Sequence, residues 1–202
     1  MAPKMKDARN LLQKFIDEYV ADRGKLRVLE AGCGSASHVN LGPEIYTVGI
    51  DIEQDQLDRN KQLDEKLLGD IQTYDLAKDD FDVIVCWDVL EHLATPEKAL
   101  SNFRNAVKPG GLVIVAMPNL YSIKGLVTRF TPHWFHVLVY RHIYNSPTAG
   151  KKGYAPFRTF LRRSVAPPAL RRSFTRAGLI EELILFYPTT MITGLKEKSR
   201  LA

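Results

Sequence analysis

The sequence predicts a doubly wound α/β fold, with a Rossmann-like, mostly parallel sheet covered by helices on both faces. Three observations support this: short apolar runs alternate with helical patterns, most runs are continuously hydrophobic, and polar residues or glycines follow them. Parallel strands have this composition because helices bury both of their faces. The chain has 202 residues, of which 45% are hydrophobic and 25% charged, as expected for one globular domain with a core.

The individual elements follow from periodicity and composition. Helices are expected over residues 8–20, 96–107 and about 168–177, where apolar side chains recur at helical spacing. Strands are expected at 26–29, 46–50, 66–68, 81–87, 112–117 and 179–187. The remainder, 188–202, reads poorly as a strand because it contains Pro188, Gly194 and a charged run at 196–198. We therefore expect that the seventh strand is absent or the chain shortened, which would leave a sheet edge to be covered by a partner, the tail or a second copy.

The chain is expected to form one domain made of four segments. These are an N-terminal helix (1–24), a ligand-binding core (25–117), an insert after the fifth strand (118–165), and a C-terminal helix, strand and tail (166–202). The insert breaks the strand–helix alternation and mixes nine aromatic residues with basic residues and prolines. It is expected to act either as a lid that contacts substrate or as a membrane-contacting segment.

Charge is distributed unevenly along the chain. Residues 1–97 carry a net charge of −9, whereas residues 98–180 contain 14 Lys and Arg and no Asp or Glu. This asymmetry favours an anionic partner, which could be a membrane surface contacted through residues 118–176, a nucleic acid or a phosphorylated substrate. The N-terminus lacks a signal peptide, and no apolar stretch is long enough to span a bilayer. A cytoplasmic protein is expected, either free or peripheral at a membrane.

Glycines and acids follow the first four expected strands. Gly32 and Gly34 follow the first, Asp51 the second, Asp70 the third and Asp88 the fourth. Ligands of open α/β sheets bind beyond the carboxyl ends of the strands, so a glycine turn ringed by acidic groups predicts a nucleoside pocket. The alternative is that the glycines only form a turn and the acids are solvated loop residues.

The residues around the turn disfavour a dinucleotide. The G-x-G-x-x-G fingerprint is incomplete, because Ser37 stands in place of the third glycine. Glu30 precedes the turn and would repel a pyrophosphate, but it suits a ligand that carries an ammonium group. A dehydrogenase is therefore disfavoured.

These motifs resemble those of class I S-adenosylmethionine-dependent methyltransferases. The resemblance spans about residues 25–118 and is carried by 28–34, 51, 69–70, 81–93 and 109–111. Within that superfamily, 88–93 and 117–119 are most similar to the ubiquinone-biosynthesis and small-molecule O-methyltransferase branch. The resemblance implies S-adenosylmethionine as cofactor, with S-adenosylhomocysteine as product. The cofactor-binding residues that it implies are Glu30, Ala31, Gly32, Cys33, Gly34, Asp51, Ile52, Asp70, Ile71, Trp87 and Asp88.

The resemblance also implies a role for the main polar positions. The glycine turn would lie under the methionine moiety, and Glu30 would contact its ammonium group. Asp51 would hold the ribose, and Asp70 with Ile71 would flank the adenine. Trp87 and Asp88 would line the pocket from the fourth strand.

Methyl transfer to a hydroxyl needs an aligned acceptor and a base. His92 is the candidate base, because imidazole titrates near neutral pH and His92 follows the fourth strand; Glu91 is counted as catalytic with it. The alternative is that Glu91 and His92 brace the next helix. On a helix Asp88, Glu91 and His92 would share a face and could hold a divalent cation, as in ubiquinone-type relatives, with Asp88 where a glutamate is more usual.

The sequence therefore predicts an S-adenosylmethionine-dependent methyltransferase acting on a hydroxyl of a small or lipid-linked acceptor. Two alternatives remain open. One is a methyltransferase acting on RNA, which the absence of a recognisable RNA-binding module disfavours. The other is a non-catalytic nucleoside-binding or scaffold protein with the same fold, which formation of S-adenosylhomocysteine would exclude.

Overall fold

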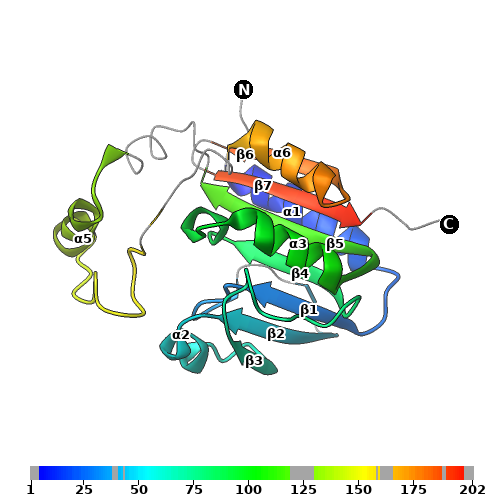
Figure 1. The fold of residues 1–202 in the computed structure, drawn as a ribbon, viewed down its shortest axis with the longest axis horizontal. Helices are drawn as coiled ribbons and strands as arrows, with labels where there is room; N and C mark the ends of the chain where they lie inside the picture. Colours follow the sequence, from blue (N-terminus) through cyan, green and yellow to red (C-terminus); the bar gives the residue numbers. More distant parts are fainter. Residues whose placement is uncertain are drawn as a thin grey trace.

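The computed structural model describes residues 5–37, 41–42, 44–118, 130–157, 159, 166–187 and 190–197. Its centre is a seven-stranded sheet in the order β3-β2-β1-β4-β5-β7-β6 (Figure 1). The strands are β1 Leu26–Ala31, β2 Ile45–Asp51, β3 Glu65–Leu68, β4 Phe81–Trp87, β5 Val107–Pro118, β6 Leu179–Tyr187 and β7 Thr190–Glu197. The helices are α1 Met5–Val20, α2 Gln54–Arg59, α3 Pro96–Ala106, α5 His133–His142 and α6 Pro167–Arg176, with a 3-10 turn, η1, at Leu90–His92.

The doubly wound α/β prediction is confirmed. Strands β1 to β5 pair in parallel, and the chain proceeds from β1 outward in both directions, through β2 to β3 and through β4 to β5. The strand order therefore reverses between β1 and β4. A crevice for a ligand is expected beyond the carboxyl ends of these two strands.

The core lies in two layers, one on each face of the sheet. Alternate residues of a strand point to opposite faces. On β1, Val28 packs in the layer that contains α1, and Leu29 packs in the layer that contains α3 and α6. Both side chains are fully buried, which explains the continuous hydrophobic runs of the sequence.

The expectation of a missing seventh strand was wrong. β7 lies between β5 and β6 and pairs antiparallel with both. The register with β6 shifts between Glu181 and Leu183, and Gly194 is the residue opposite that shift. The glycine that suggested a strand break thus lies beside a β-bulge, a position where glycine is common. Pro188 lies outside the described residues.

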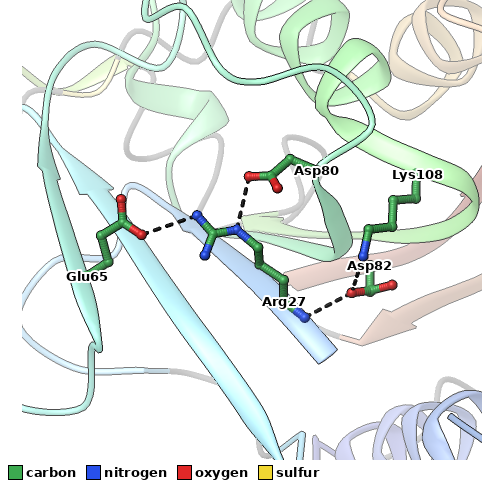
Figure 2. Close-up of polar contacts among 5 residues, drawn as sticks. All are labelled: Arg27, Glu65, Asp80, Asp82 and Lys108. Carbon is green, nitrogen blue, oxygen red and sulfur yellow. Dashed lines mark hydrogen bonds and ion pairs between the residues drawn. The ribbon is translucent and has the colours of Figure 1, made fainter. Parts of the chain in front are cut away.

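An ion-pair network ties the amino ends of the central strands together (Figure 2). The Arg27 guanidinium donates to Asp80 Oδ2 at 2.9 Å and to Glu65 Oε2 at 3.2 Å. Asp82 Oδ2 accepts from the Arg27 backbone N–H at 2.9 Å and from Lys108 Nζ at 2.8 Å. These charges lie at the end of the sheet opposite the carboxyl ends, so they stabilise the strand arrangement and take no part in the candidate site.

The insert after β5 carries α5, which stands away from the sheet (Figure 1). No side chain of α5 is buried. Within the part of the chain that the structure describes, no helix is long and apolar enough to cross a membrane.

Candidate functional site

The glycine turn after β1 needs glycine at its first position. Gly32 has a φ of +70°, and a Cβ added there would lie 2.4 Å from Val89 Cγ2. The Gly32 N–H donates to the Ile50 carbonyl at 2.8 Å, which holds the turn against the end of β2. Gly34 also has a positive φ, of +55°. Glycine at position 32 therefore lets the turn pack closely against Val89, which follows β4.

Asp51 is oriented by two backbone donors. Its Oδ2 accepts from the Gly34 N–H and its Oδ1 from the Glu53 N–H, both at 2.9 Å. Each carboxylate oxygen keeps a second lone pair that can accept from a ligand. Asp51 thus links the glycine turn to the start of α2 and presents a fixed carboxylate at the end of β2.

At the end of β3, a backbone donor likewise orients a carboxylate, that of Asp70. Asp70 accepts from the Gln72 N–H at 2.8 Å, and a Cβ at Gly69 would lie 2.3 Å from the Tyr74 ring. Ile71 is buried, and its carbonyl accepts from Asn102 Nδ2 at 2.8 Å. A carboxylate and an apolar side chain are therefore held side by side at this strand end.

The segment after β4 corrects one expectation. Asp88 has a φ of +53°, and the following turn, η1, spans three residues. Asp88, Glu91 and His92 therefore do not share a helix face. Among the described residues, no group of three or more His, Cys, Asp or Glu side chains is arranged to hold a metal ion.

These strand ends enclose one cavity of about 370 Å³. Eight of the predicted site residues line it: Gly32, Gly34, Asp51, Ile52, Asp70, Ile71, Asp88 and His92. The other described lining residues are Glu53, Gln56, Gly69, Gln72, Val89, Leu93 and Phe157. Most of the second group are within a few residues of a predicted one, so a wider window around each strand end would have found them. Phe157 belongs to the insert and has no such signal in the sequence.

The insert returns to the cavity through residues 150–157, which we call the strap. The carbonyl of Gly153 accepts from Gln56 Nε2 at 3.0 Å and from Arg59 Nη2 at 2.6 Å. The Arg59 guanidinium lies 4.5 Å from the centroid of the Tyr154 ring. The strap is thus fastened to α2, which begins three residues after Asp51.

The strap ends beside His92. The Phe157 ring meets the His92 ring edge-on, with 6.2 Å between centroids, and the Thr159 hydroxyl lies 3.5 Å from His92 Nδ1. Glu91 Oε1 lies 4.0 Å from His92 Nε2. His92 is therefore between a buried carboxylate and the insert, with its ring in the cavity wall.

Five predicted site residues are not among the lining residues. They are Glu30, Ala31, Cys33, Trp87 and Glu91. Glu30 is buried beneath the glycine turn, and the Ser37 hydroxyl donates to its Oε2 at 2.8 Å. Burial raises the pKa of Glu30, and the hydrogen bond from Ser37 partly opposes this.

Burial, with Asp51 and Glu30 nearby, raises the pKa of Cys33 to about 12, so Cys33 remains a thiol.

Glu30→Gln is expected to stabilise the ligand-free protein at neutral pH. Because the pKa of Glu30 is raised in the folded state, that state holds the proton more tightly than the unfolded chain. Its contribution to stability is complete below the ordinary glutamate pKa and is lost as pH rises through the raised value. The variant should be more stable than wild type at pH 7, and the difference should disappear near pH 4.

Denaturant unfolding over this pH range measures the difference. Glu18→Gln is the matched control, because Glu18 is exposed on α1 and should give little change. A Glu30→Gln protein that is less stable than wild type at pH 7 would contradict a pKa of Glu30 raised by burial.

Comparisons with known proteins agree with this geometry. A family model described as "Methyltransferase domain" matches residues 5–179. A ubiquinone biosynthesis O-methyltransferase of Coxiella burnetii is 26% identical over 153 residues, which cover 71% of this chain and 62% of that protein. The alignments span 55% and 62% of the length of the first two curated relatives that the chain matches.

Solved structures share the fold. An S-adenosylmethionine-dependent methyltransferase from Mesorhizobium loti superposes with a TM-score of 0.60 at 13% identity, over 91% of this chain and 96% of that one. The [4+2]-cyclase SpnF superposes with a TM-score of 0.63 at 13% identity, over 94% and 81%. At these identities the similarity is one of fold.

Proposed function

This chain belongs to the methyltransferase-domain family and has the fold of S-adenosylmethionine-dependent methyltransferases, and from this premise we propose that it methylates a hydroxyl group of a small or lipid-linked acceptor. One observation carries the proposal: the glycine turn, Asp51 and His92 open onto the same cavity. The residues that we propose to bind the nucleoside and a candidate base thus line one space.

The lining residues fit S-adenosylmethionine chemically. Gly32 and Gly34 line the cavity without side chains, and a Cβ at Gly34 would meet only Gln56 Oε1, at 3.9 Å, so the backbone of the turn is open to close approach of a ligand. Asp51 supplies a fixed carboxylate for a ribose diol, and Asp70 beside Ile71 supplies a polar and an apolar contact for a purine. Glu30 lies below the turn, and we propose that it acts on the ammonium group through Ser37 and the turn rather than as a lining residue.

S-adenosylmethionine supplies an activated methyl group, so the protein has to align the acceptor and remove its proton. We propose that the neutral His92 ring takes the hydroxyl proton. Thr159 near Nδ1 and Glu91 near Nε2 would orient the ring. Phe157 and Leu93 give the acceptor side of the cavity apolar surface, which excludes water and favours an aromatic or alkyl-bearing hydroxyl compound.

Turnover tests the proposal. The protein is incubated with S-adenosylmethionine and a panel of phenols and catechols with short and long alkyl tails, and S-adenosylhomocysteine and the methylated product are measured by mass spectrometry. Methyl ether formation with at least one acceptor is expected. Product formation on an RNA oligonucleotide instead would favour RNA methylation. Cofactor binding without product from any acceptor would favour the non-catalytic alternative.

Arg59→Ala is expected to loosen the strap, which Gln56 still holds at the Gly153 carbonyl, and to weaken S-adenosylhomocysteine binding. The change removes the bond to the Gly153 carbonyl and the stacking on Tyr154, which together should reduce affinity about tenfold. Isothermal titration calorimetry measures the loss. Arg23→Ala is the matched control, because Arg23, just after α1, stacks on Tyr19 of that helix at 4.1 Å and neither residue lines the cavity. Equal affinities of the two variants would show that the strap does not cover the cofactor.

A further inference from the structure

Exposed large hydrophobic side chains gather in one segment of the chain. Of the twelve large hydrophobics exposed in the described residues, eight lie within residues 130–157. These are Phe130, Trp134, Phe135, Leu138, Ile143, Tyr144, Tyr154 and Phe157. Single exposed apolar side chains are ordinary, but a concentration of this kind marks an interaction site.

Helix α5 lies at the centre of this segment and has no buried residue. Two local contacts hold α5 to the segment that follows it: the Arg141 guanidinium donates to the Ala149 carbonyl at 3.1 Å, and Val137 packs on Gly150. A ten-residue helix is marginal in water without an apolar surface to pack against. The face of α5 that carries Trp134 and Leu138, which we call its outer side, therefore has a physical reason to meet a partner.

The outer side combines an aromatic ring, an aliphatic side chain and a cation. Trp134, Leu138 and Arg141 are spaced at i, i+4 and i+7, so they share a helix face, and they line one shallow hollow together with His133, Val137 and Gly150. Trp134 is 63% exposed and Leu138 44% exposed. Trp beside Arg, with an aliphatic residue between them, is the composition of a helix that lies in a membrane interface.

The charge of this part of the sequence favours an anionic partner. No Asp or Glu occurs from residue 98 to residue 180, so no acidic side chain of this stretch offsets Arg141 and Lys151. An anionic lipid surface attracts such a segment. RNA would also be attracted, but it gains from stacking on aromatic rings and offers little to the exposed aliphatic side chains of Leu138 and Ile143. The mixture of aliphatic and aromatic residues therefore favours a bilayer.

We propose that the outer side of α5 and the adjoining turn, residues 130–144, dock on an anionic lipid bilayer, with Trp134 and Leu138 inserted at the level of the headgroups. The strap continues from this surface to Phe157 in the cavity wall, so docking brings the cavity close to the bilayer. The proposal deepens the lipid-linked option of the proposed function, but binding to the bilayer does not depend on turnover.

Vesicle co-sedimentation of the full chain tests the docking. The probes are phosphatidylcholine vesicles with and without about 30% phosphatidylglycerol. Binding is expected to the anionic vesicles, and it should fall steeply between about 0.1 M and 0.5 M salt, because screening weakens the charge attraction. The double variant Trp134→Ala/Leu138→Ala should lower the partition coefficient about tenfold or more, since two apolar anchors are removed.

Three controls make the result specific. Leu68→Ala/Ile180→Ala removes two exposed apolar side chains elsewhere, on β3 and β6, and should leave partitioning unchanged. Trp134→Phe keeps an aromatic anchor and should still bind, but it should lose the blue shift of tryptophan fluorescence that vesicles induce in wild type. Equal thermal stability and equal S-adenosylhomocysteine affinity of the variants separate a docking defect from misfolding or from failure of the proposed function.

Three results would overturn the proposal. The first is no binding to anionic vesicles. The second is vesicle binding that the Trp134→Ala/Leu138→Ala variant retains in full. The third is binding of a single-stranded RNA oligonucleotide that this variant abolishes while vesicles remain unbound, which would assign the surface to RNA.

Discussion

Gly32→Ala is expected to abolish binding of S-adenosylmethionine and to lower the free energy of unfolding by about 2–4 kcal/mol. Two independent effects add at this position. A non-glycine residue is strained at a φ of +70°, and the new Cβ would lie 2.4 Å from Val89 Cγ2. The turn must then move away from Val89, just after β4, which displaces the backbone on which we propose that the cofactor binds. Denaturant unfolding and calorimetry measure the two losses.

Two further variants separate these effects. Gly24→Ala should leave stability and binding unchanged, because a Cβ at Gly24 meets nothing within 4 Å and the backbone there is not left-handed. Adding Val89→Ala to Gly32→Ala should recover part of the stability by relieving the clash, but not the part due to the backbone strain. A Gly32→Ala protein as stable as wild type would show that the turn accepts a Cβ at position 32 without strain or clash.

His92→Gln is expected to lower kcat by about 10²- to 10⁴-fold, the usual loss when a general base is removed. Glutamine is similar in size and keeps hydrogen-bonding atoms, but it cannot take a proton. Affinity for S-adenosylhomocysteine should therefore stay close to wild type. The wild-type rate should rise with pH to a plateau as the imidazole becomes neutral, and the rate of the variant should not show that rise.

His142→Gln is the matched control, because His142 lies at the exposed end of α5 and does not line the cavity. It should retain the wild-type rate on a soluble acceptor. Full turnover by His92→Gln would assign proton removal to another group or to solvent.

The strands and their polar ends could be predicted from sequence because both are local features. A strand buried on two faces appears as a continuous apolar run, as in Val83 to Cys86, and the residue that follows such a run must lie at the edge of the sheet. Gly32, Asp51 and Asp70 were found in this way and do line one cavity.

The features that the sequence did not predict depend on contacts between distant segments. β7 is weak by composition, but it gains backbone hydrogen bonds from β5 on one side and β6 on the other. The strap is fastened where the Gly153 carbonyl meets Arg59, 94 residues away in the chain. The shared helix face of Asp88 and His92 was wrong because it assumed a helix where the left-handed conformation of Asp88 prevents one.

The role of the insert was also difficult to predict from sequence. Aromatic and basic residues fitted both a lid and a membrane surface, and in the structure the aromatic residues of the insert have two different environments. Phe157 lies in the cavity wall, whereas Trp134 is exposed on α5. The lid and the membrane surface that we propose therefore involve different residues of the insert.

Thermal unfolding with and without S-adenosylhomocysteine measures whether the cavity beyond β1 and β4 binds this nucleoside. At a hundredfold excess over the dissociation constant, binding should stabilise the protein by about 2.7 kcal/mol, which raises the Tm by roughly 5–10 °C. The rise should be lost in Asp51→Ala and kept in Asp58→Ala, an exposed carboxylate on α2. No rise in wild type, or a full rise in Asp51→Ala, would contradict the account.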